Sequence, residues 1–208
     1  MEVVRVPVVT ARRLPMYYRY LLTLRKLGKE RVSSTEVSAA LQIEPATVRR
    51  DFSYLGELGK RGYGYSVSYL IEFLQGYLRH DEQVGIILIG SGTAGINVSG
   101  HDQVGQLRLL AVFDVDPEAT HRRIDGVEVR PLRELREFTL STPVEIAVLT
   151  TPGRYAQAVA DAVAAAGIIG ILNFTSQFVI APAGTVLHQV DPISELQFLI
   201  YFLRRFDS

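Results

Sequence analysis

Residues 84–95 read Val-Gly-Ile-Ile-Leu-Ile-Gly-Ser-Gly-Thr-Ala-Gly, an apolar run that leads directly into three spaced glycines. Such a run is typical of a parallel strand that is covered on both faces. In the pattern G-x-G-x-x-G the first glycine permits a tight turn, the second lets the backbone approach a pyrophosphate, and the third allows close strand–helix packing. The stretch therefore predicts a nucleotide site whose phosphate-binding residues are Gly90, Ser91, Gly92, Thr93, Ala94 and Gly95.

An acidic residue at the end of the next apolar run supports this prediction. Residues 107–113 form that run, and Asp114 follows it, nineteen residues after Gly95. A carboxylate at this position can accept both hydroxyls of an adenosine ribose, and it repels the 2′-phosphate of NADP. The spacing therefore favours NAD(H) as the cofactor.

The remaining second part alternates between apolar strands and helices. Strands are expected at 146–149 and 168–172, and helices around 131–138 and 155–166. This alternation is typical of a doubly wound α/β sheet, in which ligands bind at the carboxyl ends of the strands. The residues expected at that edge are Thr150, Thr151, Pro152, Asn173 and Phe174.

The first part is predicted to contain a helix-turn-helix. Apolar residues at helical spacing predict a helix that ends near Gly28. Residues 33–36, Ser-Ser-Thr-Glu, form a capping box for the next helix. After a turn at 42–44, Pro45 opens a helix that runs to about Leu55, with Val48, Phe52 and Leu55 facing inward.

Glycines at 56, 59, 62 and 64 then predict a tight hairpin, the wing of a winged helix, before a further helix that is capped at 66–68. Arg49, Arg50 and Ser53 lie on the polar face of the second helix, where a recognition helix carries its donors. Lys60 and Arg61 on the wing could follow phosphates or enter a minor groove. The full set of candidate DNA-binding residues is Arg13, Thr47, Arg49, Arg50, Ser53, Tyr54, Lys60, Arg61 and Tyr63.

Charge is divided unevenly along the chain. Residues 1–80 carry 13 Lys and Arg against 7 Asp and Glu, whereas residues 81–208 carry 9 against 15. Such asymmetry indicates two domains, one of which faces a polyanion. Scattered surface charge would give the same counts, so the argument for DNA depends on the helix and wing residues together.

Composition excludes several classes of protein and several kinds of site. The 208 residues are 48% hydrophobic and 21% charged, as in a globular protein with a core, and no apolar run is long enough for a membrane span. The absence of cysteine excludes disulfides, iron–sulfur clusters and thiol switches. No catalytic set and no metal-ligand spacing is visible, and the N-terminus lacks a signal-peptide core, so we expect a cytoplasmic protein without a metal that is not an enzyme.

Residues 192–206 predict a terminal helix that is apolar nearly all round. Such a helix must be buried, either in its own domain or in a partner subunit.

Three stretches resemble the Rex family of redox-sensing repressors: 13–21 (Arg-Leu-Pro-Met-Tyr-Tyr-Arg-Tyr-Leu), 48–56 (Val-Arg-Arg-Asp-Phe-Ser-Tyr-Leu-Gly) and 59–65 (Gly-Lys-Arg-Gly-Tyr-Gly-Tyr). The stretches 113–117 (Phe-Asp-Val-Asp-Pro), 167–174 (Gly-Ile-Ile-Gly-Ile-Leu-Asn-Phe) and 190–191 (Val-Asp) match in the same order. The resemblance covers nearly the whole chain. It implies a homodimer with swapped C-terminal helices that represses transcription at palindromic operators and releases DNA when NADH rises.

The same resemblance implies three switch residues: Arg19, His101 and Asp191. In the family, a tyrosine six residues after the last glycine engages the acid that matches Asp191, and Arg19 matches the competing partner of that acid. Here His101 stands at the position of the tyrosine, and residues 96–100 form a poor helix sequence. We therefore expect a switch that is retuned or impaired.

The prediction is an α/β protein with an N-terminal winged-helix domain (1–79), a Rossmann-like doubly wound parallel sheet (80–190) and a C-terminal dimerisation helix (191–208) that is swapped between subunits. It is expected to act as an NAD(H)-responsive repressor on double-stranded operator DNA. The alternatives are an NAD-dependent dehydrogenase with a basic N-terminal domain, and a constitutive DNA-binding protein with a vestigial nucleotide site.

Overall fold

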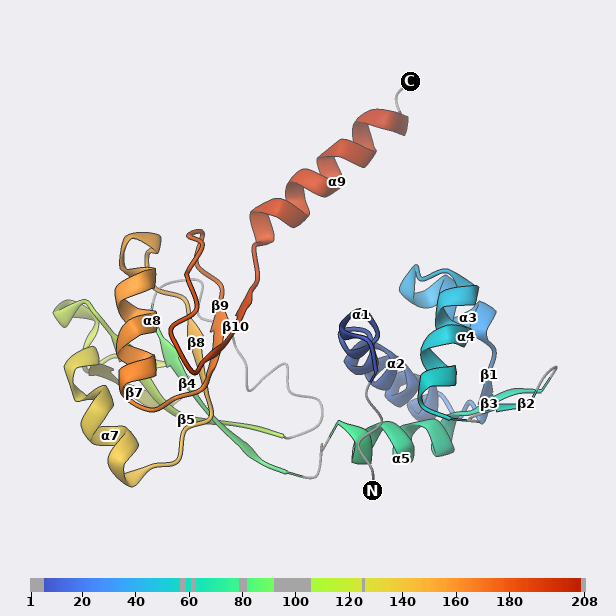
Figure 1. Ribbon diagram of the computed structural model, residues 1–208, viewed down its shortest axis with the longest axis horizontal. Coiled ribbons are helices and arrows are strands. Elements are labelled where there is room, and N and C mark those ends of the chain that lie inside the picture. Colours follow the sequence, from blue (N-terminus) through green and yellow to red (C-terminus); the bar gives the residue numbers. More distant parts are fainter. Residues whose placement is uncertain are drawn as a thin grey trace. The chain divides into compact units, whose positions relative to one another are not determined.

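The computed structural model describes residues 6–56, 59–60, 63–78, 82–91, 106–124 and 126–206 (Figure 1). The chain forms two compact units, Met1–Glu82 and Gln83–Ser208, which are described separately below.

The N-terminal unit is built on helices α1 (Val8–Ala11), α2 (Leu14–Lys26), α3 (Ser34–Leu41), α4 (Pro45–Tyr54) and α5 (Val67–Tyr77). Helix α2 has Pro15 in its first turn and buries Leu14, Tyr17 and Leu21. Because a proline lacks the N–H that a first-turn residue would leave unpaired, it suits that position. The prediction of a helix that ends near Gly28 is confirmed.

The helix-turn-helix is formed by α3 and α4. Ser33 caps α3 by accepting a hydrogen bond from the Glu36 backbone N–H, and the Glu36 side chain accepts one from the Ser33 N–H. The turn that follows contains Gln42 at a φ of +55°, and Pro45 opens α4. Val48 and Phe52 are buried on the inner face of α4, as predicted.

A small antiparallel sheet follows, with strands β1 (Arg31–Val32), β2 (Gly59–Lys60) and β3 (Gly64–Ser66) in the order β1-β3-β2. The predicted hairpin is confirmed in its two strands, whereas β1 was not predicted. A Cβ on Gly64 would lie 2.7 Å from the Val32 carbonyl oxygen, so only glycine allows this close approach of the wing to β1.

The second unit contains a seven-stranded sheet in the order β10-β9-β8-β4-β5-β7-β6. Its strands are β4 (Val84–Ile89), β5 (Leu107–Asp114), β6 (Arg123–Ile124), β7 (Val127–Pro131), β8 (Ile146–Leu149), β9 (Gly170–Asn173) and β10 (Val186–Gln189). All neighbours pair in parallel except β6 and β7. The predicted doubly wound sheet is confirmed, and the buried run of β4 lies at its centre.

Helices α7 (Leu135–Ser141) and α8 (Ala156–Ala165) lie next to each other, and the Thr139 hydroxyl donates to the Ala166 carbonyl at 3.0 Å (Figure 1). They cover one face of the sheet, where Leu135, Val159 and Val163 pack on strand side chains such as Ile87. Short 3-10 helices η1 (Pro117–Ala119), η2 (Leu132–Glu134) and η3 (Gly153–Tyr155) follow the ends of β5, β7 and β8.

Two predicted elements begin elsewhere than expected. Pro131 ends strand β7, so the helix predicted around 131–138 begins with η2 and becomes α-helical only at Leu135. The strand predicted at 168–172 is β9, which begins at Gly170, because the Ile168 N–H still bonds to the Val163 carbonyl beyond the end of α8. The segment after the glycine motif lies outside the described residues.

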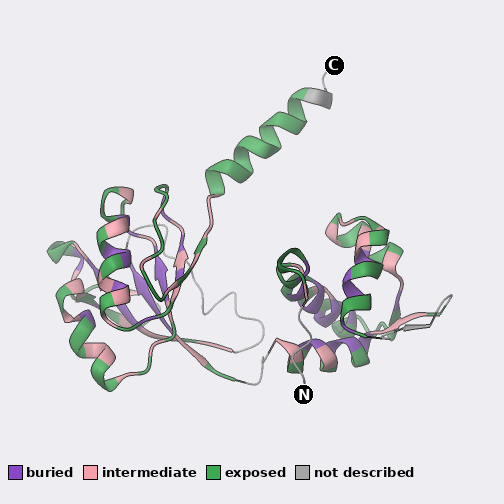
Figure 2. Cartoon of the chain, in the orientation of Figure 1, coloured by how far each residue is buried: buried purple, intermediate pink, exposed green. Residues whose placement is uncertain are grey.

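Helix α9 (Pro192–Phe206) has the predicted bounds, but none of the described residues of its own unit covers it. Every side chain described on it, from Pro192 to Arg204, is exposed (Figure 2). Of the two burial sites considered, the helix's own domain provides no cover from any of its described residues. No helix in the described ranges is long and apolar enough to span a membrane.

Candidate functional site

The candidate nucleotide site lies where the order of the strands in the sheet reverses. The chain runs from β4 to its neighbour β5 on one side, and from β8 to β9 on the other. At such a switch point the carboxyl ends of the two central strands open into a crevice. Gly90 follows β4 at a φ of +112°, and a Cβ there would lie 2.6 Å from both Thr150 C and Thr151 N. Glycine is therefore required where the loop after β4 crosses the loop after β8.

Asp114 is 7% exposed and is tied to the first turn of the glycine motif. The Ser91 N–H donates to Oδ2 at 2.6 Å, the Ser91 hydroxyl donates to the same oxygen, and the Asp116 N–H donates to Oδ1 at 2.9 Å. Burial has the largest effect on the pKa of Asp114 and would raise it. The hydrogen bonds from Ser91 and Asp116 together outweigh burial and lower this pKa below its usual range, so the carboxylate is ionised and available as an acceptor.

The two threonines after β8 have different surroundings. The Thr150 hydroxyl donates to the Gly90 carbonyl at 2.9 Å and so joins the two loops. The Thr151 hydroxyl is buried, and none of the described residues hydrogen-bonds to it. A buried hydroxyl without a partner loses its hydrogen bond to water and gains none in return. Pro152, which is exposed, begins the link to η3.

Asn173 is fully buried and its amide is engaged within the chain. Its Nδ2 donates to the Gln177 carbonyl at 2.9 Å and to Gln189 Oε1 at 2.6 Å, while its Oδ1 accepts from the Thr175 N–H. These bonds hold the loop between β9 and β10. Phe174 is half-buried against the face of the sheet opposite α7 and α8. The cofactor contacts predicted for both residues stay predictions.

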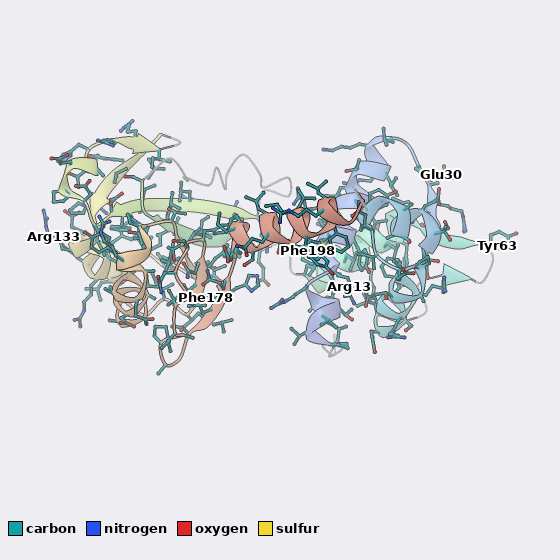
Figure 3. The ribbon with its side chains drawn as sticks, turned by 90° about the horizontal axis from the view of Figure 1, so that it is seen from above. Arg13, Glu30, Tyr63, Arg133, Phe178 and Phe198 are labelled. Carbon is teal, nitrogen blue, oxygen red and sulfur yellow. The ribbon has the colours of Figure 1, made fainter. Side chains whose placement is uncertain are left out.

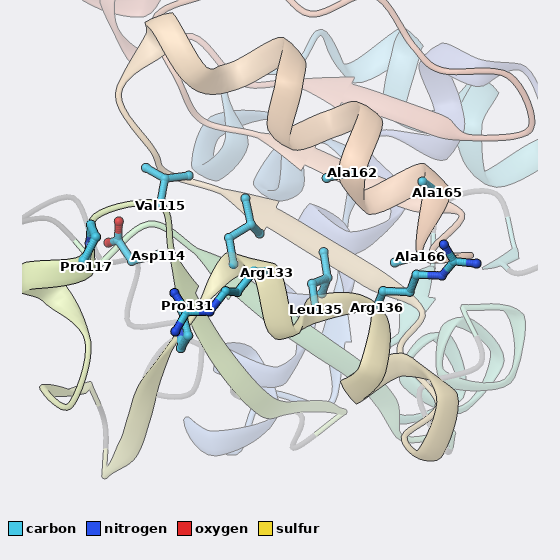
Figure 4. A pocket seen from close by; sticks show the side chains of 11 residues that line it. Asp114, Val115, Pro117, Pro131, Arg133, Leu135, Arg136, Ala162, Ala165 and Ala166 are labelled. Atoms are coloured by element: carbon cyan, nitrogen blue, oxygen red, sulfur yellow. The ribbon is translucent and has the colours of Figure 1, made fainter.

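A cavity of about 500 Å³ opens beside Asp114, between the ends of β5 and β7 and the helices α7 and α8 (Figure 4). Its lining is mostly apolar, and Asp114 lies at one end and Arg136 near the other. The lining residues are Asp114, Val115, Pro117, Pro131, Leu132, Arg133, Leu135, Arg136, Ala162, Ala165 and Ala166. Apart from Asp114 these residues were not predicted, because they come from five separate elements.

The exposed face of α4 carries the predicted donors. Arg49, Arg50, Ser53 and Tyr54 are exposed, and Thr47 is half-buried. Arg49 Nη1 donates to Ser34 Oγ at 3.3 Å. Buried Val48 and Phe52 lie on the opposite face, so the helix is oriented with these polar groups toward solvent.

Tyr63 projects from the end of the wing (Figure 3). Arg31, which was not predicted, lies over the Tyr63 ring at 5.4 Å and donates from Nη1 to the Tyr63 carbonyl at 3.0 Å. The side chain of Lys60, and all of Arg61, lie outside the described residues, as do Gly92, Thr93, Ala94, Gly95 and His101.

Arg13 has a partner that was not predicted. Its guanidinium forms a two-pronged ion pair with Asp51, a buried residue on the inner face of α4. Thr10 and Tyr17 also donate to this carboxylate. An acid on the inward face of an otherwise basic helix was the available signal in the sequence. The DNA contact predicted for Arg13 stays a prediction.

Two of the three predicted switch residues lie within the described part of the chain, one in each unit. Arg19 is exposed on α2, and Asp191 caps helix α9. The Ser194 hydroxyl donates to Asp191 Oδ2 at 2.6 Å and the Ile193 N–H to Oδ1 at 3.1 Å. These bonds, the one from Ser194 most of all, lower the pKa of Asp191. The pairing of Arg19 with Asp191 stays a prediction.

Known protein families match residues in both units of the chain. Residues 5–53 match a family model described as "Putative DNA-binding protein N-terminus", and residues 81–177 match one described as "CoA binding domain". The redox-sensing transcriptional repressor Rex 1 of Enterococcus faecalis is 46% identical over 200 residues, which cover 95% of this chain and 93% of the relative. The chain belongs to the Rex family.

Other Rex repressors align over almost their full lengths. Those of Limosilactobacillus reuteri and Halalkalibacterium halodurans are each 42% identical, and the alignments cover 97% and 99% of this chain and 95% and 98% of the relatives. These proteins are named as transcriptional repressors, in agreement with the prediction of a regulator that is not an enzyme.

Among solved structures, the Rex-family repressor RSP superimposes with a TM-score of 0.85 at 30% identity, covering 98% of this chain and 96% of RSP. RSP in complex with β-NAD⁺ and operator DNA, and RSP in complex with β-NADH, match with TM-scores of 0.84 and 0.83. The Rex fold predicted from sequence is confirmed.

Proposed function

We propose that this chain is a repressor that binds operator DNA through residues 1–79, binds NAD(H) through residues 80–190, and leaves its operator when NADH binds. The observation that carries the proposal is the buried, ionised Asp114, which lies at the carboxyl end of β5 beside a cavity of about 500 Å³. A known Rex-family repressor has been crystallised with NAD⁺ and operator DNA and with NADH, which supports both ligands.

The residues present fit a dinucleotide. Asp114 would accept the ribose hydroxyls, and the apolar cavity next to it, of a volume common for small-ligand pockets, would take the adenine base. Gly90 lets the loop after β4 pass close to the loop after β8. The level of NADH, which carries the reducing equivalent, is what the protein senses. No hydride transfer is assigned to this chain.

DNA binding is assigned to α4 and the wing. Arg49, Arg50, Ser53, Thr47 and Tyr54 would contact bases and phosphates from α4, because exposed donors on a recognition helix reach the edges of bases in the major groove. The wing would add Lys60, Arg61 and Tyr63 along the backbone or the minor groove.

We further propose a cytoplasmic homodimer on a palindromic operator. The apolar side chains of α9, in residues 191–208, are exposed in the single chain, and a second copy is the partner that would cover them. A two-fold dimer presents two recognition helices and so matches a two-fold DNA site. Arg19, Asp191 and His101 are proposed to form the switch between the two units.

The test is a titration of protein on a labelled operator duplex with NADH and with NAD⁺ separately, followed by fluorescence anisotropy. NADH is expected to release the DNA at lower concentration than NAD⁺. If calorimetry shows that NADH binds while the DNA stays bound, the chain is a constitutive DNA-binding protein with a nucleotide site. Turnover of NADH with an added carbonyl substrate would instead support the dehydrogenase alternative.

A further inference from the structure

One buried carboxylate in the N-terminal unit collects four donors. Asp51, 1% exposed, accepts at Oδ1 from Thr10 Oγ1 and Arg13 Nη2, both at 2.8 Å. Its Oδ2 accepts from Arg13 Nε and the Tyr17 hydroxyl, both at 2.6 Å. These donors fill the lone-pair positions of an ionised carboxylate. We refer to Thr10, Arg13, Tyr17 and Asp51 as the Asp51 cluster.

The protonation states in the cluster are well defined. Burial has the largest effect on Asp51 and would raise its pKa, but the hydrogen bonds from Arg13, Tyr17 and Thr10 together lower it below the usual range. Burial, and then the bond to Asp51, raise the pKa of Tyr17. At neutral pH the acid is therefore ionised and the phenol protonated, so every donor in the cluster has an acceptor.

The cluster also connects the parts of the unit that face DNA. All its donors come from residues 10–17, whereas Asp51 lies on α4 directly after the exposed Arg49 and Arg50. The Tyr17 ring packs edge-on against Phe52 at 5.0 Å, and Phe52 packs edge-on against Tyr65 of wing strand β3 at 4.8 Å. One continuous set of contacts thus joins the N-terminal segment, α4 and the wing.

In place of the DNA contact predicted for Arg13, we propose that the Asp51 cluster is a positioning device for DNA recognition, in which Arg13 and Tyr17 act through Asp51 and do not touch DNA. The Arg13 fork is geometrically matched to both oxygens of Asp51, and only 25% of its side chain is exposed. Donors that read base edges must be held within fractions of an ångström by packed supports. The inference rests on the proposed DNA binding and assigns a new role to residues 10–17.

The experiment uses the full-length protein and two labelled duplexes. One duplex is enriched from a random-sequence pool by the wild type, and the other has the same bases in shuffled order. Affinities are measured by anisotropy across a range of salt concentrations for Tyr17→Phe and Arg13→Ala. Arg25→Ala is the matched control, because it removes the same charge from an exposed position on α2, the helix that begins directly after Arg13.

We expect both cluster variants to lose about 5- to 100-fold in affinity for the enriched duplex, the discrimination that one well-placed bidentate contact supplies. Their affinity for the shuffled duplex and the dependence of binding on salt should stay close to wild type. Arg25→Ala should keep the preference for the enriched duplex. The double variant Arg13→Ala, Asp51→Ala should lose less preference than the sum of the losses of the two single variants, since the two residues share one ion pair.

A different pattern overturns the inference. If Arg13→Ala weakens both duplexes equally and lowers the salt slope by about one unit, Arg13 contacts a phosphate. If Tyr17→Phe discriminates between the duplexes as the wild type does, the cluster serves stability alone. Tyr17→Phe keeps the ring and loses a single hydrogen bond, so it decides the matter even where circular dichroism shows that Arg13→Ala does not fold. A wild type that binds neither duplex removes the proposed function itself.

Discussion

At the scale of single residues, two buried carboxylates are both ionised, but their charges have different roles. Asp51 is enclosed by donors from residues 10–17, so its charge is used within the fold. Asp114 accepts from Ser91 and Asp116 and lines a cavity, so its charge faces space that a ligand can fill. Position relative to a cavity separates a structural acid from a binding acid more clearly than burial does.

Asp51 makes the stability of the N-terminal unit dependent on pH. Because its folded-state pKa is lowered from an ordinary value of 3.8, its contribution is complete above that value and is lost as the pH falls below it. Asp51→Asn should cost about 3 kcal/mol at pH 7, as the loss of one partner of a buried ion pair does, and much less near pH 2. Urea unfolding at both pH values measures this, with Glu44→Gln, an exposed acid at the start of α4, as control. An equal cost at both pH values would contradict the assignment.

Gly90 tests the crossing of the two loops in the second unit. Gly90→Ala places a Cβ 2.6 Å from backbone atoms of Thr150 and Thr151, whereas Gly126→Ala, at a φ of +80°, meets nothing within 4 Å. Both should lose about 1 kcal/mol to backbone strain, and Gly90→Ala a further 1–3 kcal/mol to the clash. Thermal unfolding and NADH calorimetry on the two variants separate the cost of the backbone strain from the cost of the clash. Equal losses would mean that the loops can move apart at no cost.

Asp114 tests the choice of cofactor. Asp114→Ala should weaken NADH, because the ribose hydroxyls lose their acceptor, and should weaken NADPH less, since the 2′-phosphate no longer meets a negative charge. Asp116→Ala is the control, an exposed acid two residues away that points its carboxylate at the Glu118 N–H. Calorimetry with both cofactors gives the ratio of the affinities for NADH and NADPH in each variant. A wild type that already prefers NADPH would refute the argument.

At the scale of elements, helix α9 is well formed, yet none of the described residues of its own unit covers it. Asp191 caps its first turn through Ile193 and Ser194, so the helix has a defined start without tertiary support. Phe198 is 62% exposed, and its neighbours along the helix are similarly open. An apolar helix that has a good cap and that no described residue of its own unit covers is suited to packing against a second chain.

If the full chain forms the proposed dimer, removal of residues 192–208 should therefore leave monomers or aggregates. Leu199→Glu should weaken the dimer in the same direction, because a charge would be buried at the interface. Glu195→Gln on the same helix should leave it intact. Light scattering as a function of concentration measures all three. A truncated chain that remains a stable dimer would show that α9 is not the contact.

At the scale of the whole molecule, a repressor needs its two ligands to oppose each other. NADH shifts the DNA-binding equilibrium only if it binds the DNA-incompetent state more tightly. A coupling free energy of about 1–3 kcal/mol corresponds to a loss of DNA affinity of about 5- to 150-fold.

Operator DNA should lower the affinity for NADH by the same factor, because coupling between binding sites is reciprocal. NADH calorimetry with and without the operator duplex measures that factor, and Arg19→Ala should reduce it while leaving each separate affinity close to wild type. If His101 takes part in the switch, the factor should also change between about pH 6 and 8. Identical NADH affinities in the presence and absence of DNA would mean that the two sites are not linked.

Local sequence determined the features that depend on neighbouring residues. The capping box at Ser33, the start of α4 at Pro45, the apolar β4 and the bounds of α9 were all predicted, because capping, φ restriction and apolar periodicity act within a few residues. The same local logic located Asp114 at the end of β5.

Tertiary structure decided what depends on distant residues. The partners of Asp51 lie 34 to 41 residues away in sequence, and the cavity that Asp114 lines is assembled from six separate elements. Asn173, predicted at the ligand edge, is held by Gln177 and Gln189 across a loop. The direction of a side chain at the end of a strand is set by whatever packs against it, and packing partners are brought together only when the whole unit folds. Periodicity and capping carry no information about those contacts.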